Sequence, residues 1–207
     1  MNATVLELYA DHVHVLRARL DAVLDDAGLD ALVIDAGEAQ AKSRFDDQWF
    51  AYRPLAHFAH WLPLHAPGSC LVLRPGRLPL LVWHQPASYW EQPPAPSHHG
   101  FAAQMDVHMA TELAGLPAEL VAGRCAVVAE TAARAQLLAP DADFNPPALV
   151  AALDATRTIK TRYELACLGE ANALAAHGHD LLRRLFAAGG HSESARIHCD
   201  DFSRPGA

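Results

Sequence analysis

The sequence predicts an α/β domain, in which a mixed β-sheet is flanked by helices, followed by one long helix. Three observations support this fold class. Near the N-terminus, an amphipathic helical pattern leads through a glycine into a short apolar run, which is typical of layered α/β folds. Further short apolar runs alternate with helical segments up to about residue 155. Apolar residues then recur at helical spacing from residue 162 to residue 188.

The first predicted element is an amphipathic helix that ends at Gly28. Its apolar positions step by three and four residues: Tyr9, Val13, Leu16, Leu20 and Leu24. Residues 31–35 (ALVID) form an apolar run suited to a buried strand, and Gly37 ends that run. Residues 41–66 are rich in aromatic side chains, and we expect irregular structure there.

The middle of the chain predicts a β-hairpin. Residues 69–74 and 78–83 have the composition of strands, and Pro75 and Gly76 supply the turn between them. Pro79 indicates that the second strand begins at a sheet edge or in a bulge, because proline cannot donate to a ladder. Residues 92–100 predict a loop.

Shorter elements follow the hairpin. Residues 105–109 and 125–129 predict strands, and residues 111–116 and 131–138 predict short helices. A further helix is expected from Pro146 and Pro147 to about residue 154, with Asn145 as its N-cap.

The long C-terminal helix has a clear start and stop. Thr161 and Glu164 have the spacing of a capping box, and Gly189–Gly190 ends the pattern. From residue 162 to 188 it would extend roughly 40 Å. We therefore divide the chain into a domain at 1–157, the long helix at 158–190 and a polar tail at 191–207.

Composition excludes several classes of protein. The net charge of −8 argues against a nucleic-acid partner, because such partners are bound largely through phosphates. No apolar run reaches membrane-spanning length, and the N-terminus lacks a signal-peptide pattern. The four cysteines are isolated from one another, which indicates reduced thiols in a cytoplasmic protein.

Motifs for chemistry are few. Thirteen histidines are present, and eight of them come in close pairs: His12 and His14, His57 and His60, His98 and His99, His177 and His179. None has a recognised metal-ligand spacing, so we interpret them as scattered core or surface residues and expect no metal site. No nucleophile elbow and no glycine-rich phosphate loop is present, and we assign no catalytic residue.

Several short stretches together resemble the N-terminal half of bacterial Xaa-Pro dipeptidases (prolidases), which are pita-bread metallopeptidases with a small creatinase-type N-terminal domain. They are residues 8–12 (LYADH), 29–33 (LDALV), 45–47 (FDD), 57–63 (HFAHWLP), 89–90 (YW) and 160–167 (KTRYELAC) with 170–171 (EA). The last of these is the most specific, and the resemblance covers about residues 6 to 193. It implies a creatinase N-terminal domain-like fold followed by the first helix of a catalytic domain.

The resemblance also implies site residues, cofactors and partners. The intact family holds two Mn²⁺ ions with two Asp, two Glu and one His, all beyond the long helix, so this chain is expected to lack them and to be inactive alone. The match to the family's substrate-contacting residues falls on Asp47 and Trp90, which reach a neighbouring subunit's pocket. For Asp47 the simpler reading is a turn or helix-cap residue, and for Trp90 an aromatic anchor.

The expected function is therefore a non-catalytic module that dimerises or contacts substrate, as a homodimer or paired with an intact prolidase subunit. The long helix's apolar face (Leu165, Leu168, Leu181, Leu185 and Phe186) favours such pairing. The alternative is a truncated form of a manganese-dependent Xaa-Pro dipeptidase. A third possibility is a stand-alone module that binds Xaa-Pro peptides. The tail departs from the family after Glu193, which predicts a shifted reading frame or a truncated gene.

Overall fold

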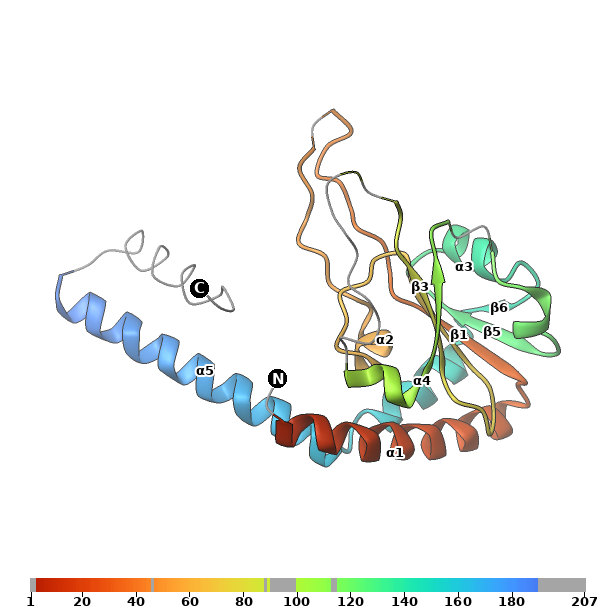
Figure 1. Ribbon diagram of the computed structural model, residues 1–207, viewed down its shortest axis with the longest axis horizontal. Helices are drawn as coiled ribbons and strands as arrows, with labels where there is room; N and C mark the ends of the chain where they lie inside the picture. Colours follow the sequence, from red (N-terminus) through yellow and green to blue (C-terminus); the bar gives the residue numbers. More distant parts are fainter. Residues whose placement is uncertain (1–2, 46, 88, 90–99, 113–114, 190–207) are drawn as a thin grey trace. The chain divides into compact units, whose positions relative to one another are not determined.

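The computed structural model describes residues 3–45, 47–87, 89, 100–112 and 115–189. Its backbone forms two compact units, Met1–Ile159 and Lys160–Ala207. The first contains the sheet and the helices packed on it, and the second contains the long helix α5 (Figure 1). Among the described residues, no helix combines the length and the apolar character that a membrane span requires.

A mixed β-sheet forms the centre of the first unit. Its strands are β1 (Ala31–Asp35), β2 (Cys70–Leu73), β3 (Leu80–His84), β4 (Asp106–Ala110), β5 (Cys125–Val128) and β6 (Asp143–Phe144). They are ordered β4-β3-β2-β1-β5-β6. The pairs β1–β2 and β2–β3 are antiparallel, whereas β3–β4, β1–β5 and β5–β6 are parallel. The predicted fold class, a mixed sheet flanked by helices with a long helix after it, is confirmed.

Helices cover both faces of this sheet (Figure 1). They are α1 (Ala3–Ala27), α2 (Ala56–Trp61), α3 (Ala132–Leu138) and α4 (Pro147–Thr156), with 3₁₀ turns η2 (Gly100–Gln104) and η3 (Ala118–Leu120). Side chains alternate along β1, so Ala31 and Val33 share one core with α3. Ile34 faces the other way and lines a small cavity with residues of α1, α2 and α4. The strand β1 is therefore buried on both faces.

The strongest sequence patterns correspond to observed elements. The helix ending at Gly28 and the strand at 31–35 are present, and so is the 70–84 hairpin, in which Cys70 pairs with Val82. The helix α3 begins at the cap Thr131, whose side chain accepts a hydrogen bond from the Arg134 amide at 3.2 Å. These elements follow from local patterns that tertiary packing does not override.

The structure differs from the sequence analysis in five details. The irregular region at 41–66 contains α2, and the two-residue strand β6 was missed. Thr111–Glu112 form a bend and Gly115–Leu116 are irregular, so the helix expected at 111–116 is absent from its described residues. Pro79 lies just before the interior strand β3 rather than at an edge, and its carbonyl accepts the Asp106 amide at 2.9 Å.

The fifth difference concerns Asn145, which does not cap α4. The cap position is Pro146, without a side-chain hydrogen bond. Asn145 has a positive φ of 44°, and its side chain accepts from the Ala129 amide and donates to the Ala129 carbonyl. Asn145 thus extends the pairing of β5 and β6 by one position.

The second unit begins with the predicted capping box. The Thr161 hydroxyl accepts from the Glu164 amide at 3.3 Å, and the Glu164 carboxylate accepts from the Thr161 amide at 2.8 Å. The helix α5 spans Arg162–Ala187, and Asp180 pairs with Arg183 and Arg184 near its end. Large apolar side chains along it are about half exposed: Leu165, Leu168, Leu174 and Phe186.

Candidate functional site

A hairpin-like excursion leaves the sheet after β1 and carries the candidate residue Asp47. Its described residues are 38–45 and 47–52, here named the hairpin arm, and they form the long orange loop that projects from the sheet in Figure 1. Its two legs are joined by a bridge between Ala41 and Trp49 and by the amides of Lys42 and Phe50, which donate to Gln48 and Gln40. These bonds make the arm an ordered element without a regular ladder.

The far end of the arm is exposed and aromatic. Asp47 lies there and is exposed to solvent. Phe45 is 90% exposed, Trp49 57% and Phe50 56%. Large apolar side chains gathered on one exposed element mark a surface that binds another molecule more often than an ordinary solvent face.

Trp90, the second predicted substrate-contacting residue, lies outside the described residues. The structure therefore neither brings it to Asp47 nor separates it from Asp47.

The base of the arm is held against the sheet by hydrogen bonds to backbone carbonyls. The Ala36 carbonyl accepts from the Tyr52 hydroxyl at 2.8 Å and from the Leu55 amide at 3.1 Å, so both legs meet at one residue. Gly37, with φ of +84°, accepts from the Gly68 amide at 2.8 Å. Gly68 also has a positive φ, and a Cβ there would lie 2.6 Å from His84, so glycine is required at that contact.

A buried ion pair lies directly beneath this base. Arg134 of α3 donates from Nε to Asp35 Oδ1 at 2.9 Å and from Nη2 to the Gly68 carbonyl. Its Nη1 lies 3.5 Å from Glu38 Oε1. Both members of the pair are almost fully buried, with side chains 6% and 1% exposed.

The electrostatics of this pair affect its neighbours. Burial raises the pKa of Asp35, although the Arg134 guanidinium opposes the rise. Burial, with the Asp35 carboxylate as a smaller cause, raises the pKa of Tyr52 to about 12. Tyr52 is thus a stable hydrogen-bond donor at neutral pH.

The sequence reasoning did not single out Asp35, Arg134 or Tyr52. Their partners lie far away in the sequence, so no local spacing reveals them. The available signal was Asp35 itself, a carboxylate at the end of an otherwise apolar buried strand, where a charge needs a partner.

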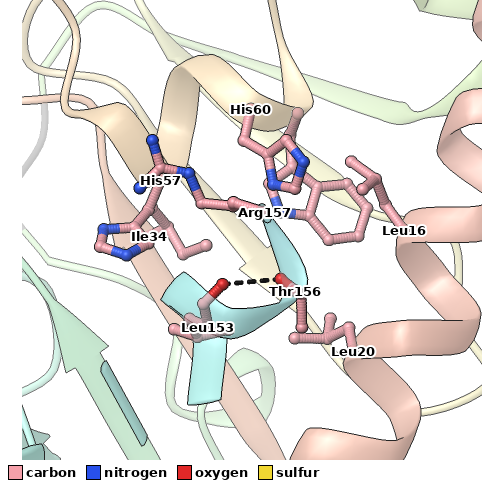
Figure 2. A pocket seen from close by; sticks show the side chains of 9 residues that line it. Leu16, Leu20, Ile34, His57, His60, Leu153, Thr156 and Arg157 are labelled. Carbon is pink, nitrogen blue, oxygen red and sulfur yellow. Dashed lines mark hydrogen bonds between the residues drawn. The ribbon is translucent and has the colours of Figure 1, made fainter. Parts of the chain in front are cut away.

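Two cavities lie near the carboxyl ends of β1 and β5. Figure 2 shows the smaller one, enclosed by residues such as Leu16, Ile34 and His60, with a volume of about 20 Å³. This is room for about one water molecule and not for a substrate. The larger is an open groove of about 640 Å³ between α2 and α4. Its walls are mainly apolar, and His57 and Asp154 pair across one end at 3.1 Å.

The paired histidines have ordinary structural roles where they are described. His12 is buried and its Nε2 lies 2.9 Å from the His60 carbonyl. His177 and His179 are exposed on α5, and His98 and His99 lie outside the described residues. Within the described parts of the chain, no three His, Cys, Asp or Glu side chains gather to hold a metal ion. The described His, Cys, Asp and Glu side chains therefore do not form a site that fits the two Mn²⁺ ions that the resemblance associates with intact prolidases.

Comparison with known proteins decides the family. The model of the family described as "Xaa-Pro dipeptidase, N-terminal domain" matches residues 7–154. The chain belongs to this family. The match covers the sheet, the hairpin arm and most of α4.

Whole-chain relatives agree with this assignment. The chain is 34% identical to an Xaa-Pro dipeptidase of Marinobacter nauticus over 189 residues, which cover 91% of the chain and 43% of the relative. It is 36% identical over 185 residues to an Xaa-Pro dipeptidase of Xanthomonas campestris pv. campestris, covering 88% of the chain and 41% of the relative. The chain thus spans about two fifths of the length of these relatives. The unmatched part of the chain is shorter than α5, so at least part of α5 belongs to the match.

A solved structure supports the fold. A structure described as "a putative aminopeptidase P from Bacillus anthracis" superposes with a TM-score of 0.52 at 14% identity, covering 86% of this chain and 45% of that one. At this identity the likeness concerns the fold alone.

Proposed function

We propose that this chain serves as the N-terminal, non-catalytic module of an Xaa-Pro dipeptidase, and that it presents Asp47 to the substrate pocket of a neighbouring subunit. The observation that carries the proposal is the position of Asp47 on the exposed end of an arm whose base is fixed. A carboxylate held there can form a charge-assisted bond to the free amino group of an Xaa-Pro dipeptide. Trp90 is proposed to line the same pocket, on the resemblance alone.

Pairing with another subunit is part of this proposal. Phe45, Trp49 and Phe50 give the arm an aromatic surface, and aromatic residues are enriched in protein interfaces. The partner is a second copy of this chain or an intact prolidase subunit in the cytoplasm. The helix α5 is proposed to be the first helix of the catalytic domain, in which two Mn²⁺ ions would be held by residues beyond it.

The pairing is tested by the oligomeric state of the full chain. We expect a dimer by sedimentation equilibrium, and we expect Phe45→Ser with Trp49→Ser to weaken it by at least tenfold, since buried aromatic residues dominate interface energies. Leu78→Ser is the matched control, because Leu78 is 46% exposed in the turn between β2 and β3. A monomer at every concentration, or equal weakening by the control, would exclude the arm as the interface.

The non-catalytic role is tested by proline release. The purified chain, with and without Mn²⁺, should release no proline from an Xaa-Pro dipeptide. Release that follows the chain through purification would favour the alternative, a truncated dipeptidase that retains activity.

A further inference from the structure

One side chain of α3, Arg134, contacts the end of β1, the start of the hairpin arm and the loop before β2. Arg134 has partners on two separate segments of chain: it donates hydrogen bonds to Asp35 and to the Gly68 carbonyl, and it forms an ion pair with Glu38. Asp35 is the last residue of β1, and Glu38 is the first residue of the arm. The arginine therefore spans the junction at which strand becomes arm.

The Gly68 carbonyl connects Arg134 to the other hydrogen bonds at the base of the arm. Gly68, whose carbonyl Arg134 holds, donates its amide to the Gly37 carbonyl at 2.8 Å. The carbonyl of the next residue, Ser69, accepts a hydrogen bond from the Ala36 amide at 2.9 Å. The outgoing leg is thus fixed both directly, through Asp35 and Glu38, and indirectly, through the loop before β2.

The shape and charge of arginine suit this position. Its planar guanidinium donates in several fixed directions at once, which a lysine ammonium on a flexible stem does not reproduce. Because Arg134 is only 6% exposed, water cannot readily replace the hydrogen bonds that its acceptors would lose on substitution. Asp35 Oδ2 has no hydrogen-bond partner among the described residues. The Asp35 carboxylate is stabilised chiefly by the Arg134 guanidinium, which donates to Oδ1, and to a smaller extent by the Gly37 backbone N–H.

We infer that Arg134 is a positioning residue, which fixes the base of the hairpin arm and thereby the place at which Asp47 is presented. The part concerning Asp47 rests on the proposed function. The part concerning the arm rests on the hydrogen bonds at its base and holds for the chain by itself.

The experiment is amide hydrogen exchange of the full chain, followed by NMR, for wild type and Arg134→Lys. The base is reported by the amides of Leu55 and Gly68, and the sheet by those of Val33 and Val72. We expect exchange at the base to become about tenfold faster, as the loss of a buried bond to a charged group implies, while the sheet amides stay protected. Arg183→Lys, which alters an exposed arginine of α5, is the matched control and should change neither set.

A second variant keeps the test decisive if Arg134→Lys does not fold. The double substitution Asp35→Asn with Arg134→Gln removes both buried charges together, which proteins tolerate better than removing one. It too should accelerate exchange at the base and leave the sheet protected. Two results would overturn the inference: unchanged exchange rates of the Leu55 and Gly68 amides in a folded variant, or an equal increase in exchange rate at the base and in the sheet.

This readout separates the two proposals. Asp47→Ala should leave exchange at the base unchanged, because Asp47 lies at the far end of the arm. If Asp47 does not contact substrate, the exchange result for Arg134 still stands. If the exchange result fails, the proposal that Asp47 contacts substrate still stands.

Discussion

At the scale of single residues, burial decides which side chains can react. Cys70 is fully buried in β2, and burial raises the pKa of its thiol to about 12. Burial also raises the pKa of Cys125 in β5 to about 11, with the nearby Asp143 carboxylate as a second cause. The thiolate is the reactive form, so both cysteines should be inert in the folded protein.

This gives a prediction about thiol labelling. In a Cys199→Ser variant at pH 8, a disulfide reagent should label one thiol per folded chain, that of the partly exposed Cys167. With a pKa of about 12, only about 1 in 10,000 Cys70 thiols is ionised at this pH. Unfolding in urea should release all three remaining thiols. Rapid labelling of two or three thiols before unfolding would contradict the burial of β2 and β5.

At the scale of elements, Asn145 fixes how β6 leads into α4. Its backbone amide donates to the Val127 carbonyl at 2.9 Å, and its side chain bonds Ala129 twice. Asparagine tolerates a positive φ better than most residues, so one residue satisfies both the conformation and the bonds.

Substitutions of Asn145 separate the contribution of its positive φ to stability from that of its side-chain hydrogen bonds. Asn145→Gly keeps the conformation but loses two hydrogen bonds, which should cost about 2 kcal/mol of unfolding free energy. Asn145→Ala adds backbone strain and should cost about 1 kcal/mol more. Urea unfolding measures both, and the exposed Gln136→Ala on α3 should stay within about 0.5 kcal/mol of wild type. Equal losses for glycine and alanine would show that the positive φ carries no cost.

The elements predicted correctly from the sequence are those with local causes. The capping box of α5 joins residues three apart, and the core face of α1 repeats over several turns. The helix α2 has six residues and no capping side chain, so its formation depends on packing that the sequence does not display. Asn145 resembled a helix cap because its strand partner, Ala129, lies 16 residues away.

The same distinction applies to the candidate site. Asp47 was located by resemblance, and the structure adds that it lies at the end of an ordered, aromatic arm. The arm's support was beyond sequence reasoning, because Arg134 meets Asp35 across 99 residues and Gly68 across 66.

At the scale of the whole molecule, the chain is a member of the Xaa-Pro dipeptidase N-terminal domain family and matches about two fifths of its relatives' length. In the proposed function, the contribution of Asp47 to catalysis is made in a neighbouring subunit. Such a contribution is separable from the chemistry, because a substitution at Asp47 would change turnover at a site on the neighbouring subunit.

The most direct measurement uses a mixed dimer. The chain would be co-expressed with the intact Xaa-Pro dipeptidase of Xanthomonas campestris, and the heterodimer isolated through a tag on each subunit. Asp47→Ala in this chain should lower kcat/KM for an Xaa-Pro dipeptide by roughly tenfold to a hundredfold, as expected for a lost charge-assisted hydrogen bond. An Asp47→Ala heterodimer as active as the wild-type heterodimer would contradict the account, and the absence of any heterodimer would exclude an intact prolidase subunit as the partner.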